Sequence, residues 1–548
     1  MNIASHLTSM ARSQPWRPAV VFPHTRDPQG RVSYTHYTFR QLDEASDRLV
    51  LGFSRFGIQR GMRVALMVPP SLDFFALTFA LFKLGAVPVL IDPGIGLPNL
   101  GKGLAEAAPE AFIGIPKAHA ARVVLGWARA TVRFKVTVGD QALWGGITLN
   151  RVRELGATGS PRPAVDPEAN ETAAILFTSG STGPSKGVVY THEYFGAQVD
   201  HIRRLYGIQP GEIDLPTFPL FALFGPALGM TAIIPDMDPT RPAQVDPAKI
   251  AEAVENFGVT NMFGSPAVIR RVGRYGEQTG LKLLSLRRVI SAGAPVPAKE
   301  LQRFTRLLPP GAQVFTPYGA TECLPVSSIG TDEILGETRH QTDLGRGVCV
   351  GRPVPGLTVK IIKISDAPVP AWDKTLELAA GEIGEIVVKG GHVTRIYFNR
   401  PEATALAKIT DGSGGEFYHR MGDLGYMDPD GRIWFCGRKS HRVVTRHATF
   451  FTIPCEAIFN THPSVFRSAL VGVDREGQTE PVMCIELEAD VQTDREALIA
   501  ELRDMAAKHT HTRAIQRFLV HPAFPVDIRH NAKIFRERLA VWASRQRA

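Results

Sequence analysis

Helical patterns alternate with short β-branched segments along about the first 435 of the 548 residues. The helix-like stretch YTFRQLDEASDRLVLGFSRFG (37–57) precedes the strand-like RVALMVPP (63–70). The helix-like PAKIAEAVENFG (247–258) likewise precedes VTNMFGSP (259–266) and LRRVISAGAP (286–295). A strand that follows a helix returns parallel to the strand before it, so this order favours layered α/β subdomains with mostly parallel sheets.

The pattern changes twice in the second half of the chain. GEIGEIVVKG (381–390) and GRIWFCGR (431–438) are bounded by turn residues, which predicts a smaller β-rich, barrel-like unit before residue 436. A short polar segment follows, and an α+β mixture then begins with FRSALVGV (466–473). Short polar segments between patterned blocks are typical linkers. We therefore predict an N-terminal domain (1–437), a hinge (438–442) and a small C-terminal domain (443–548).

Composition favours a cytoplasmic protein. The five cysteines form no C-x-x-C pair, which is typical of reduced thiols. The net charge of +9 comes from scattered residues without a known reader motif, so we expect no nucleic-acid partner. The first 20 residues have no long apolar core, so we expect no signal peptide. The most apolar segment (74–91) contains Lys83, Gly85 and Pro88, so we expect no transmembrane segment.

A glycine- and hydroxyl-rich loop, TSGSTGPSKG (178–187), lies between the apolar runs TAAILF and VVY. Small residues of this kind let backbone N–H groups and hydroxyls surround a phosphate. Its lysine, Lys186, stands between Ser185 and Gly187, so the Walker spacing G-x-x-x-x-G-K-[ST] is absent. The loop predicts phosphate binding but disfavours a P-loop ATPase.

Four further motifs follow the loop in a fixed order. They are YGATE (318–322), GRPVPG (351–356), MGDLGYMDPDGRIWFCGR (421–438) and RHNAKIFRERL (529–539). Together with the loop, this set resembles the adenylate-forming superfamily of acyl-CoA synthetases, peptide-synthetase adenylation domains and luciferases, over essentially the whole chain. The resemblance implies a large N-terminal domain that binds ATP and an acid, and a mobile C-terminal domain that carries a catalytic lysine.

The resemblance also implies roles for individual residues around ATP and Mg²⁺. The grip on the β- and γ-phosphates would come from Thr178, Ser179, Gly180, Ser181, Thr182, Gly183 and Lys186. Glu322 would hold Mg²⁺ and Thr321 the α-phosphate, while Lys533 would bind both the carboxylate and the α-phosphate. Adenine and ribose would contact Tyr318, Gly319, the SAGAP-loop residues Gly293, Ala294 and Pro295, and further on Asp423 and Arg438.

Several positions depart from the pattern of CoA ligases. Ala222 stands where a histidine or aromatic residue is usual, Ser440 replaces a hinge Asp or Lys, and Ala532 replaces the glycine before the lysine. After the hinge, VVTRHATFFTIPCE lacks the glycine pair that lines a pantetheine channel in the family. We expect the bulky Arg446 and His447 to crowd such a channel.

The amino-acid sequence of the loop region, together with FPLFALFGPALGM and YGATECLPV, resembles that of the β-lactone synthetases of bacterial long-chain olefin biosynthesis. That branch implies adenylation of a 2-alkyl-3-hydroxy long-chain fatty acid, whose 3-hydroxyl then attacks the activated carbonyl. Candidate bases for that hydroxyl are His192, His441 and His447. The candidate pocket residues are His192, Phe221, Ala222 and Gly264.

Three alternatives stay open at this point. A long-chain acyl-CoA synthetase shares the first half-reaction, and an acyl-AMP ligase would feed a carrier protein. A catalytically dead nucleotide-binding scaffold is disfavoured because Glu322 and Lys533 are both present. A nearly insoluble substrate also suggests assembly with a thiolase, a reductase and a lactone decarboxylase.

Overall fold

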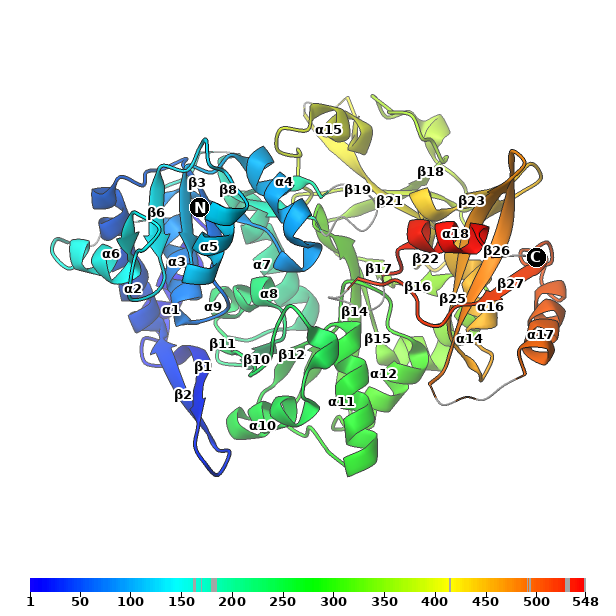
Figure 1. The fold of residues 1–548 in the computed structure, drawn as a ribbon, viewed down its shortest axis with the longest axis horizontal. Coiled ribbons are helices and arrows are strands. Elements are labelled where there is room, and N and C mark those ends of the chain that lie inside the picture. Colours follow the sequence, from blue (N-terminus) through cyan, green and yellow to red (C-terminus); the bar gives the residue numbers. More distant parts are fainter. Residues whose placement is uncertain are drawn as a thin grey trace.

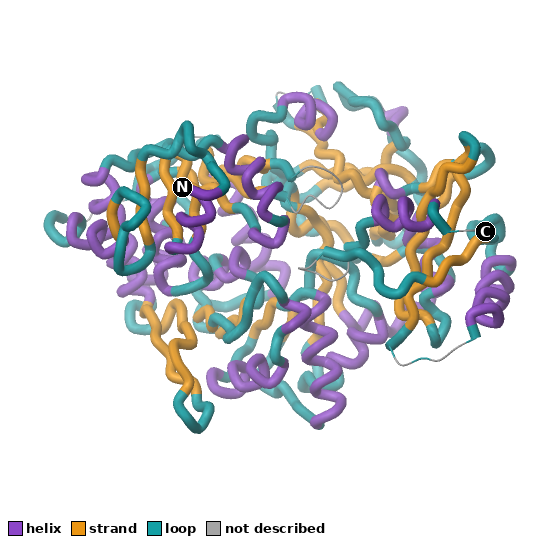
Figure 2. Tube along the Cα trace, in the orientation of Figure 1, coloured by secondary structure: helices purple, strands orange, loops and turns teal. Residues whose placement is uncertain are grey.

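The computed structural model describes residues 1–160, 164–168, 170–178, 185–412, 415–489, 491, 494–527 and 533–546. Within these residues the strands form two large mixed sheets, a six-stranded sheet, a three-stranded sheet and a two-stranded hairpin. Figure 1 shows the two large sheets and the six-stranded sheet around the centre of the molecule, with the C-terminal elements at the right. Helices cover the sheets in layers (Figure 2). The predicted α/β class is confirmed.

The seven-stranded sheet is parallel except at one end. Its strands, in spatial order, are β7 (Ile147–Thr148), β6 (Phe134–Thr137), β5 (Ala111–Gly114), β3 (Arg63–Met67), β4 (Val87–Leu90), β8 (Thr172–Phe177) and β9 (Gly187–Thr191). Strands β8 and β9 pair antiparallel, which places the glycine-rich loop at their turn. The accompanying helices are α2 (Phe39–Phe56), α3 (Leu72–Leu84), α4 (Leu97–Ala107), α5 (Pro116–Val124) and α6 (Leu149–Leu155).

The nine-stranded sheet has a parallel centre and antiparallel edges. Its order is β17 (Arg352–Pro353), β15 (Cys323–Gly330), β14 (Gln313–Ala320), β13 (Arg288–Ile290), β12 (Asn261–Phe263), β10 (Ile213–Pro216), β11 (Thr231–Ile233), β1 (Pro18–Arg26) and β2 (Val32–Thr38). Its helices include α1 (Ser5–Ser13), α7 (His192–Tyr206), α8 (Pro219–Ala222), α9 (Phe224–Leu228), α10 (Pro247–Phe257), α11 (Pro266–Thr279), α12 (Ala298–Thr305), α13 (Thr331–Glu333) and α14 (Arg339–Asp343).

Two helices lie between the large sheets and hold them together. Helix α3 contacts β4 of one sheet and β1 of the other, and α7 contacts β9 and β15 in the same way. Ser71 caps the start of α3, and Gly85 ends it in the left-handed conformation with φ +73°. Ten apolar or small residues of α3 are buried, so its all-round apolar sequence reflects its position between two sheets rather than a membrane.

A buried ion pair joins α3 to α2. Lys83 Nζ lies 2.7 Å from Asp43 Oδ1 and 2.6 Å from Asp47 Oδ1, and the lysine side chain is 2% exposed. We expect Lys83→Met to destabilise this unit by about 3 kcal/mol, because two carboxylates lose their buried partner. The exposed pair Arg151–Glu154 supplies a control, since Arg151→Ala should change stability by less than about 0.5 kcal/mol. The urea concentration at the unfolding midpoint measures both effects. Equal midpoints for Lys83→Met and Arg151→Ala would contradict a stabilising role for the buried ion pair.

The predicted β-rich unit before residue 436 is confirmed as an antiparallel sheet. Its strands are β16 (Val348–Cys349), β22 (Ile433–Arg438), β21 (Phe417–Met427), β19 (Gly384–Lys389) and β18 (Thr358–Ile362), with β20 (Lys408–Thr410) paired to β21. Helix α15 (Pro401–Ala407) precedes β20. The last residue of β22, Arg438, begins the segment predicted as the hinge.

The C-terminal residues form the predicted α+β unit. Its elements are the hairpin β23 (Val443–Val444) and β24 (Thr449–Phe450), the sheet β25 (Val465–Arg475), β26 (Gln478–Leu487) and β27 (Arg517–Val520), and the helices α16 (Thr452–Phe459), α17 (Arg495–Ala507) and α18 (Arg536–Ser544). It contacts the larger part of the molecule through Glu488, which lies 3.4 Å from Lys299, and through Arg270, whose guanidinium lies 4.2 Å from the Phe466 ring centroid.

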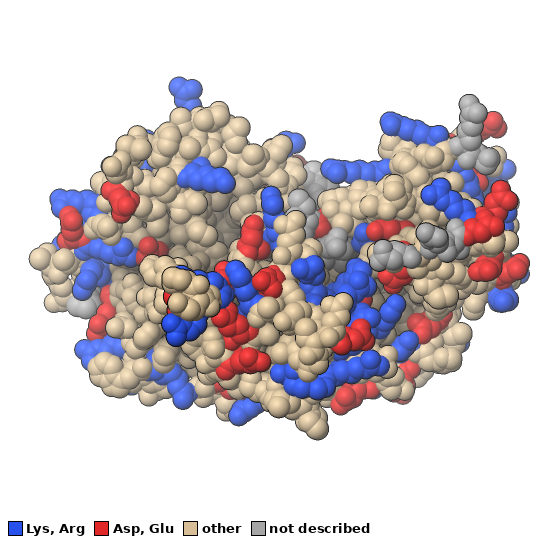
Figure 3. All heavy atoms as spheres, turned by 60° about the horizontal axis from the view of Figure 1, so that its bottom comes forward, with Lys and Arg blue, Asp and Glu red and all other residues tan. Residues whose placement is uncertain are grey.

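The surface charges, the helices and the cysteines bear on the expectations from composition. On the face drawn in Figure 3, basic and acidic side chains are interspersed, without a stripe of one sign. Among the described residues, every helix is too short or too polar to traverse a lipid bilayer. All five cysteines are buried and unbridged.

Candidate active site

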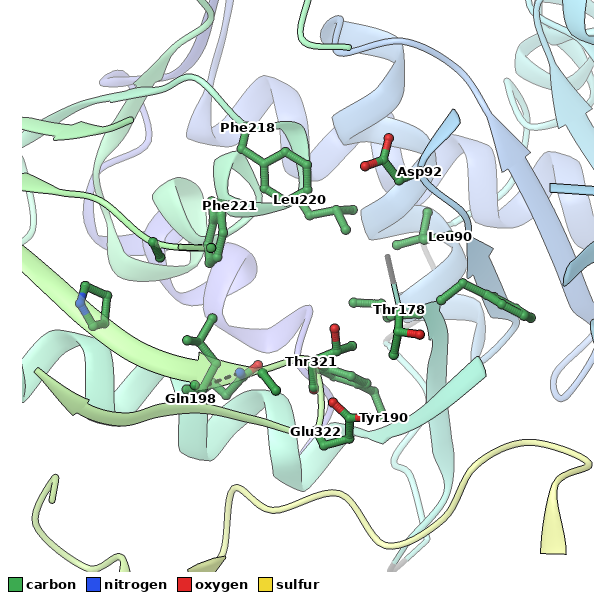
Figure 4. Close-up of a pocket in the computed structure, with 18 of the residues that line it drawn as sticks. Leu90, Asp92, Thr178, Tyr190, Gln198, Phe218, Leu220, Phe221, Thr321 and Glu322 are labelled. Carbon is green, nitrogen blue, oxygen red and sulfur yellow. Dashed lines mark hydrogen bonds between the residues drawn. The ribbon is translucent and has the colours of Figure 1, made fainter. Parts of the chain in front are cut away.

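One cavity of about 590 Å³ lies where the two large sheets, the six-stranded sheet and the C-terminal unit meet. Eight of the residues predicted from the sequence to bind ATP or the acid line it: Thr178, Lys186, Gly293, Gly319, Thr321, Glu322, Arg438 and Lys533. Much of the rest of its wall is aromatic or aliphatic. In Figure 4, Phe218, Leu220 and Phe221 lie across the open space from Thr321 and Glu322. The cavity therefore combines a charged side with a large apolar side.

A β-hairpin turn presents two of these residues. Strands β14 and β15 pair Ala320 with Cys323, so Thr321 and Glu322 are the two residues of the turn between them. The Tyr190 hydroxyl donates a 2.6 Å hydrogen bond to the Thr321 carbonyl. The Tyr397 hydroxyl donates a second, also 2.6 Å, to Glu322 Oε1. Both turn residues are thus held in place by buried tyrosines.

Five residues of the glycine-rich loop that were predicted to bind phosphate, Ser179, Gly180, Ser181, Thr182 and Gly183, lie outside the described residues.

The two ends of that loop are joined at its base. Thr178 N–H donates to the Lys186 carbonyl at 3.0 Å, and Lys186 N–H donates to Thr178 Oγ1 at 3.1 Å. The Lys186 ammonium lies 4.5 Å from the centroid of the Tyr397 ring. Tyr397 therefore contacts both Lys186 and Glu322, and it links the loop to the hairpin turn.

A second lysine, Lys408 of β20, lies near the same carboxylate. Its ammonium donates to the Thr394 carbonyl and lies 4.7 Å from the centroid of the Phe417 ring. Burial lowers the pKa of Lys408 to about 7, and the negative charge of Glu322 opposes that shift. Neither Tyr397 nor Lys408 was identified from the sequence, since no motif or spacing connects them to Glu322.

Sheet register brings together the residues predicted to bind ribose. Asp423 of β21 and Arg438 of β22 are cross-strand partners, and Arg438 Nη1 lies 3.0 Å from Asp423 Oδ1. The Tyr318 hydroxyl donates to Asp423 Oδ2 at 2.7 Å. Burial raises the pKa of Asp423, and the charge of Arg438 opposes the shift. Arg438 lines the cavity, whereas Tyr318 and Asp423, which were predicted to contact adenine and ribose, do not line it.

The loop after β13 and the end of β14 supply backbone to the cavity wall. Gly293, with φ +102°, and Gly319 both line it. A Cβ at Gly319 would approach the Cys323 carbonyl to 2.5 Å, so the hairpin requires glycine there. Ala294 and Pro295 do not line the cavity.

The C-terminal unit contributes Lys533, which lines the cavity. Its backbone is tied to Asp527, since Lys533 N–H donates to Asp527 Oδ1 at 3.0 Å and Asp527 N–H donates to the Lys533 carbonyl at 3.0 Å. The charge of Lys533 also lowers the pKa of Asp423. The structure therefore places this lysine in the cavity that holds Thr321 and Arg438.

A sequence model of the AMP-binding enzyme family matches residues 7–398. The chain belongs to the AMP-binding enzyme family. The olefin β-lactone synthetase of Xanthomonas campestris pv. campestris is 51% identical over 100% of this chain and 98% of its own length. The olefin β-lactone synthetase of Stenotrophomonas maltophilia is 52% identical over 99% of this chain and 98% of its own length. The solved amide bond synthetase of Marinactinospora thermotolerans has the same fold, with a TM-score of 0.79, 21% identity and 99% of both chains covered.

The apolar side of the cavity in this AMP-binding enzyme is built largely from phenylalanines. Phe221 of α8 packs on Phe263 with 4.3 Å between ring centroids, and both line the cavity with Phe218 and Phe224. Of the pocket residues predicted from the sequence, Phe221 lines the cavity. Ala222 and Gly264 are buried but do not line it.

The histidines considered as bases do not line the cavity of this enzyme. His192 is 4% exposed, and its Nδ1 accepts a 3.2 Å hydrogen bond from Ile3 N–H. Burial lowers the pKa of His192 to about 4 and that of His441 to about 3. His192 follows the loop in sequence, but its ring faces the N-terminal segment.

The segment expected to crowd a pantetheine arm also lies away from the cavity. Arg446 and His447 are exposed in the β23–β24 connection and do not line the cavity. Lys439 and Ser440 of the predicted hinge line it instead, and Lys439 Nζ lies 3.1 Å from the buried carboxylate of Glu385. In this arrangement the structure gives no support to crowding by Arg446 and His447.

Proposed function

We propose that this adenylate-forming ligase activates a 2-alkyl-3-hydroxy long-chain fatty acid with ATP and closes it to a β-lactone, releasing pyrophosphate and AMP. The observation that carries the proposal is 51–52% identity, over the whole chain, to two olefin β-lactone synthetases. The cavity supports it, because a charged side suited to ATP and a carboxylate adjoins a long apolar wall suited to alkyl chains.

Adenylation brings together two anions, a carboxylate and the α-phosphate, which repel each other. The cations that line the cavity offset this repulsion: Lys533 would contact both anions, Lys186 the outer phosphates and Arg438 the ribose or phosphate. The hydroxyl of Thr321 would donate to the α-phosphate. The loop residues 178–183 would surround the β- and γ-phosphates.

Glu322 is the proposed protein ligand of Mg²⁺. Among the described residues, no group of three or more His, Cys, Asp or Glu side chains gathers as a metal site. Mg²⁺ bound with a nucleotide needs only one or two carboxylates besides phosphate oxygens and water, so a single Glu322 on the cavity wall fits it. When bound, the ion would spread the negative charge of the phosphates.

Ring closure needs no second substrate. The 3-hydroxyl and the activated carbonyl belong to one molecule, so the hydroxyl has a high effective concentration, which offsets part of the strain of a four-membered ring. In the alternative reactions, by contrast, the thiol of CoA or of a carrier protein would have to enter the cavity as a separate molecule.

The reaction sequence around the enzyme follows from this substrate. A thiolase and a reductase would supply the hydroxy acid and a lactone decarboxylase would consume the product, in the cytoplasm. Residues 1–437, 438–442 and 443–548 remain our proposed domain, hinge and mobile domain.

Mass identification of the product tests the proposal. The enzyme is given a racemic 2-alkyl-3-hydroxy acid, ATP and Mg²⁺, with and without CoA. We expect the β-lactone and AMP in both reactions. AMP formation that requires CoA and yields a thioester would instead show a long-chain acyl-CoA synthetase, and acyl transfer to a carrier protein would show an acyl-AMP ligase.

Phe221 is expected to limit the alkyl chain length. A second cavity of about 60 Å³ adjoins the first, and Phe221 lines both. Phe221→Ala should join them and raise kcat/KM about tenfold for acids two carbons longer, because each buried methylene contributes about 0.8 kcal/mol. Phe218 lines only the larger cavity, so Phe218→Ala is the control and should not show this gain. An unchanged chain-length profile in Phe221→Ala would refute the assignment.

A further inference from the structure

Gln198 of α7 lines the cavity and carries a buried carbonyl oxygen without a hydrogen-bond partner among the described residues. The residue is 3% exposed and lines the cavity. Its Nε2 donates to the Leu324 carbonyl at 2.8 Å and to the Tyr194 hydroxyl at 3.3 Å. Its Oε1 is buried and accepts no hydrogen bond from any described residue. Sequence analysis did not identify this residue.

These bonds define which way the amide faces. Both amide hydrogens are used, so Oε1 is the remaining hydrogen-bonding group of Gln198, and it is left without a donor in the part of the chain that the structure describes. A buried acceptor without a donor is unfavourable, and native proteins seldom retain one without a ligand, an ion or a water. An uncharged amide oxygen does not attract a cation as strongly as a carboxylate does. The geometry therefore favours a hydroxyl or N–H donor on the bound molecule.

Gln198 lies close to the reacting end of the cavity. The Gln198 amide donates to the Leu324 carbonyl. Leu324 is three residues from Thr321 along the chain, so the Cα atoms of Leu324 and Thr321 are at most about 11 Å apart. Tyr190, in strand β9 just before α7, donates its hydroxyl hydrogen to the Thr321 carbonyl itself. Figure 4 shows Gln198 on the same side of the open space as Thr321 and Glu322. Gln198 therefore lines the same side of the cavity as the turn at which the carboxyl would be activated.

We infer that Gln198 Oε1 accepts the hydrogen bond of the substrate's 3-hydroxyl, an inference that rests on the proposed function. The bond would turn a lone pair of the hydroxyl oxygen toward the acyl carbonyl. In the step that follows, that oxygen forms a bond to the carbonyl carbon, and the bond from this carbon to the AMP phosphate oxygen breaks. The hydroxyl hydrogen ends on a phosphate oxygen of the departing AMP, so no external base is consumed. Gln198 binds and positions the hydroxyl and takes no proton.

The test compares two acids that differ only at carbon 3. Acid-dependent ATP–pyrophosphate exchange and lactone release are measured for Gln198→Met with a 2-alkyl-3-hydroxy acid and its 3-deoxy analogue. We expect the KM of the 3-hydroxy acid to rise, and lactone release to fall, about tenfold, as for the loss of one buried hydrogen bond. Exchange with the 3-deoxy acid should stay within twofold of wild type.

A matched variant separates hydrogen bonding from cavity shape. Phe195 also lines the cavity from α7, about one turn before Gln198, and has no polar group. Phe195→Leu should alter exchange with both acids alike. Equal losses for both acids in Gln198→Met would show that Gln198 only shapes the cavity, and no loss for either would show that a water satisfies its oxygen. Both results overturn the inference.

If the Gln198→Met variant fails to fold, the same hydrogen bond can be tested in the wild-type enzyme by changing the substrate instead. A 3-methoxy acid keeps the oxygen but lacks the donor hydrogen, so its KM should exceed that of the 3-hydroxy acid about tenfold. Equal KM values would overturn the inference. Failure of the proposed function gives a different result, namely wild-type exchange without lactone, or no exchange with any acid.

Discussion

Lys533→Ala is expected to abolish acid-dependent pyrophosphate release while leaving ATP binding nearly unchanged. Lys533 reaches the cavity from the C-terminal unit, whereas the other proposed phosphate contacts, such as Lys186 and Thr321, belong to the larger part of the chain. ATP can therefore bind without Lys533, but the carboxylate and α-phosphate lose the cation between them. Removal of one such group from a preorganised site costs about 10²–10³-fold in rate. ATP–pyrophosphate exchange measures the rate, and calorimetry measures ATP binding.

An exposed lysine of the same unit serves as the control. Lys508, at the end of α17, does not line the cavity, so Lys508→Ala should retain wild-type exchange. Unchanged exchange in Lys533→Ala would remove the main support for an adenylation role of the C-terminal unit. A parallel loss of ATP binding would instead assign Lys533 to nucleotide binding.

Glu322→Gln is expected to lower the adenylation rate about 10²-fold and to raise the Mg²⁺ concentration at half-maximal rate. The amide keeps the shape of the side chain and an oxygen for the Tyr397 hydroxyl, but it removes the charge that a hard cation requires. A magnesium titration of ATP–pyrophosphate exchange gives both quantities.

Tyr397→Phe separates the charge of Glu322 from its orientation. The variant removes the 2.6 Å bond to Glu322 Oε1 and leaves the carboxylate charged. It should slow exchange only about tenfold, as expected for one hydrogen bond to a charged group. An identical magnesium dependence in wild type and Glu322→Gln would contradict the proposed metal ligand.

The motifs predicted the part of the site that local sequence determines. The hydroxyl-rich loop needed small residues between two strands, and its described ends, Thr178 and Lys186, are joined at the base and line the cavity. The two residues Thr321 and Glu322 form a hairpin turn that presents both to the cavity. The alternating pattern likewise predicted α2, β3, α10 and β12 close to their observed bounds.

The rest of the site depends on tertiary packing that no spacing reveals. Tyr397 reaches Glu322 across 75 residues, and Gln198 is oriented by a carbonyl 126 residues away. His192 shows the opposite error: proximity to the loop in sequence suggested a site residue, but its ring accepts a hydrogen bond from Ile3 N–H and does not line the cavity. The path of the β23–β24 hairpin, which places Arg446 away from the cavity, could not be predicted from the sequence either.

Oxygen transfer from the acid to AMP is the most direct test of the central claim. The enzyme is given ATP, Mg²⁺ and a 2-alkyl-3-hydroxy acid whose carboxyl oxygens are both ¹⁸O, and the AMP is weighed by mass spectrometry. If the acid is adenylated and its own hydroxyl displaces AMP, each AMP carries one ¹⁸O and each lactone keeps one. AMP without ¹⁸O, formed at the same rate with or without the acid, would contradict the account.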